Sequence, residues 1–307
     1  AWRWRHLLLA PHRLGFFLAV TVLVSAGAWW ALVQLDRASA LVGLSYAVSP
    51  SLAHATVMTF GFMPLFFSGF LFTAAPKWLG ARPLEARQLR APLVLLATSW
   101  GLWLLGSHVQ VMLAVLGLAG AVVGLGWMIL LFWRLVAVSS AEDRLHAKVI
   151  GMGGGVGWIS LVGACVALLI DAPLVGRACV LTGLWGFVVV TYVTVAHRMI
   201  PFFTSSAVPM VAVWRPFWVL WVLLSAAAME AAIMRQPALV FLTSSAGFEN
   251  GSHWPMRPVT REKVGRNRTA GKLSASGVQE RCRPQMRAVC RMSTGKLSQQ
   301  STALREP

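Results

Sequence analysis

The stretch His54–Gly80 reads HATVMTFGFMPLFFSGFLFTAAPKWLG and decides the fold of this chain. It carries no ionisable side chain between His54 and Lys77. A helix needs about 20 apolar residues, at ~1.5 Å each, to cross the hydrocarbon core of a bilayer. Pro76, Lys77 and Trp78 then end the stretch with a charged, interfacial sequence. It is therefore predicted to be a membrane-spanning helix.

The composition extends this prediction to the whole chain. Of its 307 residues, 57% are hydrophobic and only 12% are charged, and 15 are Trp. These values exclude an ordinary soluble domain and indicate a polytopic membrane protein, with membrane lipid as its surroundings. The basic segment before the first apolar run is interpreted as a cytoplasmic lead-in and not as a cleaved signal peptide, because that run is too long for a signal-peptide core.

Seven apolar stretches are predicted to cross the membrane, which gives an all-α, polytopic transmembrane helical bundle. An eighth apolar run begins at Ala238 and is interrupted before it can cross. The predicted spans cover approximately residues 14–35, 54–80, 91–106, 111–134, 149–170, 174–196 and 217–234.

The last part of the chain differs in character from the rest. Residues 1–246 are predicted to form the transmembrane helical domain, and residues 247–307 a basic, disordered tail. Its abrupt start inside an apolar run favours an out-of-frame or otherwise unrelated C-terminus. The alternative is a genuine basic cytoplasmic tail that binds anionic lipid weakly.

The net charge of +17 raises the question of a nucleic-acid partner. Outside the tail, however, Lys and Arg are concentrated in alternate loops, which is the positive-inside pattern of membrane proteins. This pattern places the N-terminus in the cytoplasm and gives no indication of nucleic-acid binding. The residues on the predicted cytoplasmic side are Arg3, Arg5, Arg13, Lys77, Arg82, Arg87, Arg90, Arg134, Arg144, Lys148, Arg198 and Arg215, against Arg37, Arg177 and Arg235 on the opposite side.

Two further patterns exclude other chemistries. The cysteines Cys165, Cys179, Cys282 and Cys290 form no CxxC motif or Cys/His zinc spacing, which argues against structural zinc and covalently attached haem. The sequence GMGGGVGW at 151–158 lacks the GxGxxG spacing of a dinucleotide loop. It offers small-xxx-small pairs for close helix packing, Gly151 with Gly155 and Gly153 with Gly157.

The histidines form two sets on opposite sides of the predicted bilayer. His54 and His108 lie at the non-cytoplasmic face, and His146 and His197 at the cytoplasmic face. A core of about 30 Å separates the sets, so one metal cannot bind both. Neutral imidazole commonly binds haem iron and copper, which makes each set a candidate ligand pair. In the alternative interpretation, His108 and His146 are loop residues in contact with water.

Met58 follows His54 by one helical turn, so both side chains share a helix face and offer lone pairs. In the alternative interpretation, His54 only forms hydrogen bonds at the membrane interface and Met58 fills space. Glu230 is the single carboxylate inside a predicted span, at 217–234. It is either part of a proton relay or a side chain that reaches the nearby interface.

Two stretches resemble the NnrS family of bacterial membrane proteins. They are HATVMTFGF at 54–62 with GFLFTAAPKWLG at 69–80, and HRMIPFFT at 197–204. The chain departs from the family pattern at Thr56 and Val57, where the family has His and Glu, and at His197, where it has Gly. The family is also longer, which implies that this chain is truncated at its C-terminus.

The resemblance implies an inner-membrane protein that contains haem and copper and acts in nitric oxide metabolism and denitrification, with nitric oxide as a small-molecule ligand. It carries His54 over as an axial haem ligand or part of a copper site, with Met58 beside it. His197 would be an additional ligand, and Arg198 would pair with a haem propionate. Two alternatives remain, a non-catalytic transporter that depends on Glu230 and a truncated chain without function.

Overall fold

All regular secondary structure in the described residues, 4–39, 43–208 and 214–233 of a computed structural model, is helical, and none of these residues lies in a strand. The all-α prediction is thereby confirmed. Most helices are α-helices; η1 is a 3-10 helix, and η2 and η3 are π-helices. Their bounds are η1 Trp4–Leu9, α1 Pro11–Ser39, α2 Pro50–Val57, η2 Met58–Phe62, α3 Met63–Trp78, α4 Ala86–Val109, α5 Val111–Ala137, α6 Leu145–Leu169, α7 Pro173–Gly183, η3 Leu184–Val189, α8 Val190–Ala207 and α9 Phe217–Ile233.

Six continuous helices in the described residues are long and apolar enough to cross a membrane. Two of them combine three elements each, namely α2, η2 and α3 over Pro50–Trp78, and α7, η3 and α8 over Pro173–Ala207. The seventh predicted span corresponds to α9, a shorter apolar helix of 17 residues. The interrupted eighth run and the tail at 247–307 lie outside the described residues, so the predicted boundary after residue 246 stays a prediction.

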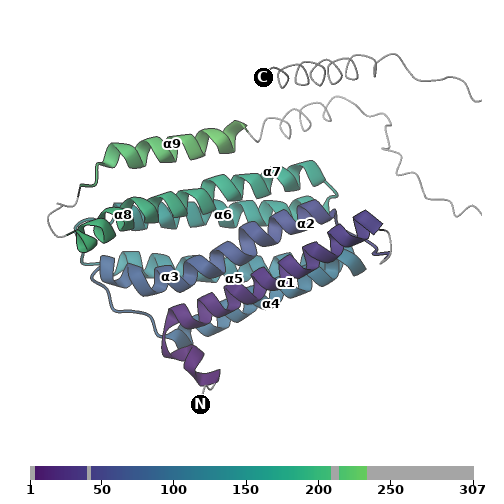
Figure 1. Cartoon of the computed structure of the whole chain (residues 1–307), viewed down its shortest axis with the longest axis horizontal. Coiled ribbons are helices and arrows are strands. Elements are labelled where there is room, and N and C mark those ends of the chain that lie inside the picture. The colour runs from purple at the N-terminus through teal and green to yellow at the C-terminus, as the bar shows by residue number, and fades with distance from the viewer. Residues whose placement is uncertain (1–3, 40–42, 209–213, 234–307) are drawn as a thin grey trace, which may run out of the picture. The chain divides into compact units, whose positions relative to one another are not determined.

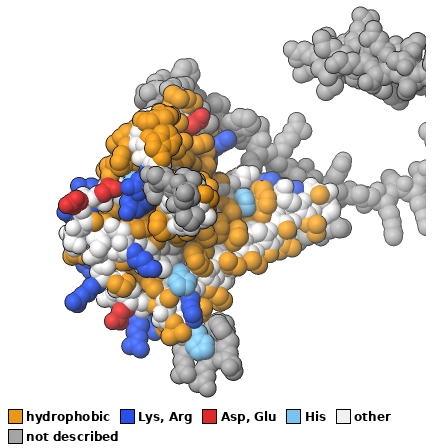
Figure 2. All heavy atoms as spheres, turned by 60° about the vertical axis from the view of Figure 1, so that its left-hand side comes forward, with side chains coloured by type: hydrophobic (Ala, Val, Ile, Leu, Met, Phe, Trp, Pro, Cys, Tyr) orange, Lys and Arg blue, Asp and Glu red, His pale blue; other side chains and the backbone are white. Residues whose placement is uncertain are grey.

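The helices lie side by side, and successive long helices run in opposite directions (Figure 1). The contacts pair α4 with α5, α5 with α6 and α6 with α7, while α1 packs on α3 and α4, and α9 packs on α8 and η3. Trp100, Trp103 and Phe60 are among the largest fully buried side chains between them. Apolar side chains cover the flanks, and many Lys and Arg side chains gather at one end (Figure 2). This distribution is that of a bundle embedded in lipid.

Glycine permits close contacts between helices, as two examples show. A Cβ on Gly15 of α1 would lie 2.6 Å from the Cα of Gly69 in α3, so the two backbones touch at this crossing. On α6, a Cβ on Gly153 would lie 3.1 Å from Val190 of α8, which bears out the predicted packing role of this glycine. Gly155 has open space around it, so the predicted packing role of the pair Gly151 and Gly155 is wrong at that residue.

One π-helical segment packs against the residue that precedes the other. Phe60 of η2 is fully buried, and its ring occupies the space that a side chain on Gly183 would need. Gly183 directly precedes η3. Segments of π-helix are rare and occur frequently at functional sites. The hydropathy of the two spans gave no sign of either segment.

Candidate functional site

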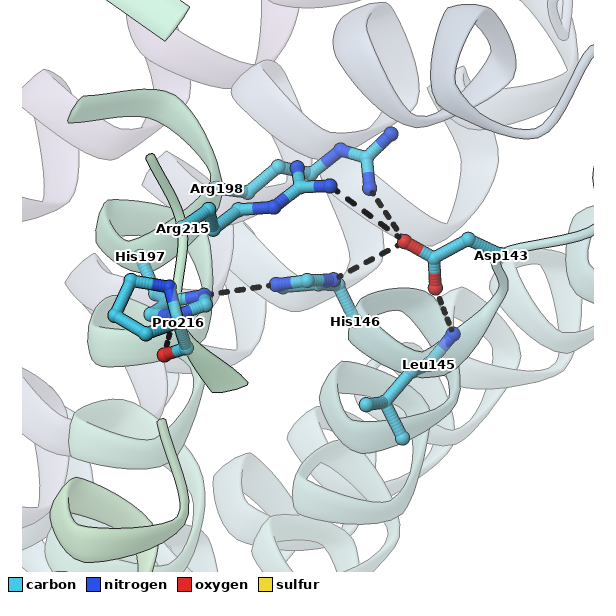
Figure 3. Close-up of polar contacts among 7 residues, drawn as sticks. All are labelled: Asp143, Leu145, His146, His197, Arg198, Arg215 and Pro216. Atoms are coloured by element: carbon cyan, nitrogen blue, oxygen red, sulfur yellow. Dashed lines mark hydrogen bonds and ion pairs between the residues drawn. The ribbon is translucent and has the colours of Figure 1, made fainter. Parts of the chain in front are cut away.

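A pair of buried imidazoles lies at one end of the bundle. His146 is in the first turn of α6 and only 2% exposed, and His197 of α8 is 9% exposed. Nε2 of His146 lies 3.0 Å from Nδ1 of His197, and the two rings are stacked with an interplanar angle of 22° (Figure 3). Nε2 of His197 lies 3.0 Å from the carbonyl oxygen of Pro216. These two hydrogen bonds thus link α6, α8 and the segment before α9.

These hydrogen bonds assign the tautomers. A carbonyl oxygen only accepts, so Nε2 of His197 carries a proton, and the Nδ1 of a neutral His197 accepts. Nε2 of His146 therefore donates, and its Nδ1 keeps an unprotonated lone pair. That Nδ1 is buried and has no hydrogen-bond partner among the described residues. A buried ring nitrogen without a hydrogen-bond partner is uncommon. Such a nitrogen can bind a metal ion or accept a hydrogen bond.

A carboxylate and two guanidinium groups lie beside this lone pair (Figure 3). Oδ2 of Asp143 lies 4.0 Å from Nδ1 of His146, 3.6 Å from Arg198 and 3.9 Å from Arg215. The other oxygen of Asp143 accepts a hydrogen bond from the backbone N–H of Leu145, which fixes the carboxylate at the start of α6. Arg198 also stacks over Trp78, 5.2 Å from the ring centroid. With one carboxylate against two guanidinium groups, the cluster retains one positive charge.

A cavity of about 440 Å³ adjoins the histidine pair between α8 and α9. His197 and Arg215 supply its polar side, and most of the remaining wall is apolar. Its volume lies in the range of ligand pockets, which combine mostly apolar walls with a few polar groups. The other lining residues are Tyr192, Val193, Ala196, Ile200, Pro201, Trp214, Pro216, Val219 and Leu223.

The second set of histidines lies at the opposite end of the long helices. His108 is in the last turn of α4, where Nε2 accepts a hydrogen bond from Trp29 at 2.6 Å and Nδ1 lies 2.7 Å from the carbonyl oxygen of Ser45. Both ring nitrogens are thus engaged, and the ring ties α1 and the segment before α2 to α4. This arrangement gives His108 a structural role.

His54 of α2 stacks on Trp30 of α1, with ring centroids 4.4 Å apart and an interplanar angle of 17°. Its Nδ1 is buried and unpartnered among the described residues. Met58 follows at the start of η2 and packs against the core. No contact between His54 and His108 is described, although both rings border the adjacent Trp29 and Trp30. The structure therefore brings together the predicted pair His146 and His197 in direct contact, and not the pair His54 and His108.

The structure corrects the positions of three histidines. The alternative interpretation makes His108 and His146 loop residues in contact with water, yet both belong to helices and His146 is fully buried. His197 was placed after the end of a span, but the helix continues to Ala207. In each case the helix extends past the end of the apolar run.

Sequence reasoning missed Asp143, Arg215 and Trp78 as members of this cluster. Asp143 precedes His146 by three residues and lies just before α6, which begins at Leu145. Arg215 and Trp78 are distant in the sequence from both, and no local pattern indicates that they meet. Among the described residues, no group of three or more His, Cys, Asp and Glu side chains is arranged to hold a metal ion.

The fold and this cluster define a multi-pass membrane protein of the helical-bundle class. The family model described as NnrS protein matches residues 6–264, and the chain belongs to this family. No curated protein and no solved structure matches the chain.

The family implies haem and copper, and the residue types of the cluster fit such groups. The unpartnered Nδ1 of His146 is a free imidazole lone pair, and two guanidinium groups offer partners for carboxylates beside a largely apolar cavity. His197 has both ring nitrogens in hydrogen bonds, so its binding to iron would replace one of them. The unpartnered Nδ1 of His54 and the thioether of Met58 are donor types that suit copper.

Proposed function

We propose that this protein binds haem and copper in the bacterial inner membrane, with its N-terminus in the cytoplasm, and acts in the response to nitric oxide. The observation that carries the proposal is the buried pair of His146 and His197, beside two guanidinium groups and a cavity of about 440 Å³. Membership of the NnrS family supports it independently. Bound haem iron would supply a site for nitric oxide.

Each residue of the cluster has a distinct part in this proposal. His146 or His197 provides the imidazole ligand, since both rings are buried beside the cavity and the two guanidinium groups. Arg198 and Arg215 bind the carboxylates of the cofactor, for which the planar guanidinium is suited. Trp78 holds the Arg198 side chain in place by cation–π contact. His54, with Met58, is the proposed copper ligand at the other end.

The proposal is tested by optical spectra of the detergent-purified full chain, oxidised and dithionite-reduced, together with metal analysis. A Soret band is expected to shift on reduction and again on addition of nitric oxide. His146→Ala and His197→Ala are expected to lower the haem content several-fold, and His54→Ala to lower the copper content. His12→Ala is the control, because His12 belongs to neither set.

Two results contradict these assignments. Haem content that is unchanged in both His146→Ala and His197→Ala excludes this cluster as the haem site. A folded protein without chromophore or metal, purified from cells supplied with both, contradicts the proposed function itself.

A transporter is the second candidate, favoured by the interruption of two spans by π-helical segments and by Glu230 in α9. Glu230 is partly buried, and no ion pair of it is described. Colourless protein whose substrate uptake is lost in Glu230→Gln would favour this function over metal binding.

A further inference from the structure

A second cavity of about 440 Å³ lies where α2 and α7 begin, at the end of the bundle opposite the His146 cluster. Its polar groups are the hydroxyls of Ser49 and Ser51 and the guanidinium of Arg177. The remaining wall is apolar and consists of Leu52, Ala55, Pro173, Leu174, Val180 and Leu181.

The polar groups of this cavity are free to bind a ligand. Ser49, Ser51 and Arg177 are exposed, and no hydrogen bond or ion pair links them to another described side chain. Ser49 precedes α2 without a capping hydrogen bond from its side chain. The carboxylate of Asp171 lines a smaller neighbouring cavity and forms no described ion pair with Arg177. The positive charge is therefore not neutralised by a described carboxylate.

The cavity extends along α2 and α7, each of which begins a long apolar helix. Its lining runs over residues 49–55 at the start of α2 and residues 173–181 along α7. At ~1.5 Å per residue, the second stretch corresponds to a depth of roughly 12 Å. The hydroxyls lie at the start of α2 and Arg177 lies one helical turn into α7, and apolar side chains line the depth beyond them as far as Val180 and Leu181. A ligand that matches this order has an anionic head and a hydrocarbon chain.

We propose that this cavity binds a phospholipid. Its phosphate is held by Arg177, Ser49 and Ser51, and an acyl chain follows the groove between α2 and α7. Basic pockets between membrane helices bind lipid headgroups through the same charge complementarity. A bilayer also supplies this ligand at high local concentration. The site is separate from the His146 cluster and does not depend on the proposed function.

The test is native mass spectrometry of the full chain in detergent, titrated with phosphatidylglycerol. Arg177→Gln is expected to weaken binding of the lipid about tenfold, because one charge-assisted hydrogen bond is lost. Arg177→Lys keeps the charge and is expected to retain most of the binding. Arg37→Gln is the matched control, because Arg37 belongs to the same end of the bundle but lies over Trp30 and lines no described cavity.

Each of the following outcomes contradicts the proposal. If Arg177→Gln folds and retains the lipid as the wild type does, the cavity is not the binding site. An equal loss in Arg37→Gln means that surface charge alone attracts the lipid. If inorganic phosphate at millimolar concentration displaces phosphatidylglycerol, the cavity is a site for anions and not for lipids. If Arg177→Gln does not fold, equal retention by Ser49→Ala/Ser51→Ala and wild type contradicts the proposed phosphate contacts.

Discussion

His146 donates a hydrogen bond from Nε2 to Nδ1 of His197, 3.0 Å away, and so links the start of α6 to α8. Because Nε2 of His197 in turn donates to the carbonyl oxygen of Pro216, two neutral rings have one assignment of protons, in which Nε2 of His146 is the donor. The consequence is a single buried lone pair, on Nδ1 of His146, that faces a carboxylate and two guanidinium groups.

Replacing His197 is expected to destabilise the bundle. His197→Ala leaves the donor on Nε2 of His146 buried without a partner, which costs about 1–3 kcal/mol of unfolding free energy. Thermal unfolding of the purified protein in detergent measures the effect. Thr204→Ala, at an exposed position of α8, is the control and is expected to change little. An equal unfolding temperature for His197→Ala and the control would show that the pair does not stabilise the fold.

The contribution of Arg198 to stability is expected to depend on the planar shape of its side chain as well as on its charge. Arg198 is 19% exposed and combines an ion pair to Asp143 with a stack on Trp78. Arg198→Gln is expected to lower stability by roughly 1–2 kcal/mol, and Arg198→Lys by less, because lysine keeps the charge but not the planar group.

Asp143→Asn is the matched comparison for the ion pair. Asp143 is 42% exposed, so loss of its charge is expected to cost less than about 1 kcal/mol. If Asp143→Asn proves as destabilising as Arg198→Gln, the ion pair and not the stack on Trp78 is the larger contribution. Chemical unfolding in the same detergent compares the three variants.

Two glycines are expected to give opposite results when replaced by alanine. Gly183→Ala forces a methyl group into the ring of Phe60 and is expected to destabilise the bundle by about 1–3 kcal/mol. Gly155→Ala has open space, so it is expected to be neutral or to stabilise by up to about 1 kcal/mol through its helix propensity. Unfolding measurements on both variants test this difference in sign.

The double variant Gly183→Ala/Phe60→Leu identifies the cause. A smaller side chain at residue 60 makes room for the methyl group, so the two substitutions are expected to be less damaging together than their sum. Strict additivity would mean that Phe60 is not the group that excludes a side chain at Gly183.

Tyr46, in the segment before α2, is expected to titrate at unusually high pH. Partial burial raises the pKa of Tyr46 above its usual value of 10.0, and its hydrogen bond to Asp36 at 2.9 Å acts in the same direction. The protonated phenol therefore contributes stability that is complete below pH 10 and is lost as the pH rises through the folded-state pKa.

Ultraviolet difference absorbance measures this titration. The chain has two tyrosines, so the experiment is made in a Tyr192→Phe background. Asp36→Asn is expected to lower the titration midpoint of Tyr46, because the neighbouring negative charge is removed. A midpoint that does not move would leave burial as the only cause.

The local sequence determined the membrane bundle. The apolar run after His54 and the charged, interfacial end at Lys77 and Trp78 are sufficient to define a span, because a helix must satisfy its backbone hydrogen bonds within the bilayer. The same argument located the six helices of membrane length. It also placed His146 and His197 on the same side, since both lie next to span ends.

Only the tertiary structure decided which of these polar groups meet. The contact of His146 with His197, the position of Asp143 between Arg198 and Arg215, and the engagement of both nitrogens of His108 depend on helix rotation and packing. Hydropathy specifies how far a helix reaches through the bilayer but not which face it turns to its neighbours, because lipid and protein interior are similarly apolar. Close contacts such as Gly15 with Gly69 fix those faces, and they depend on residues that are far apart in the chain.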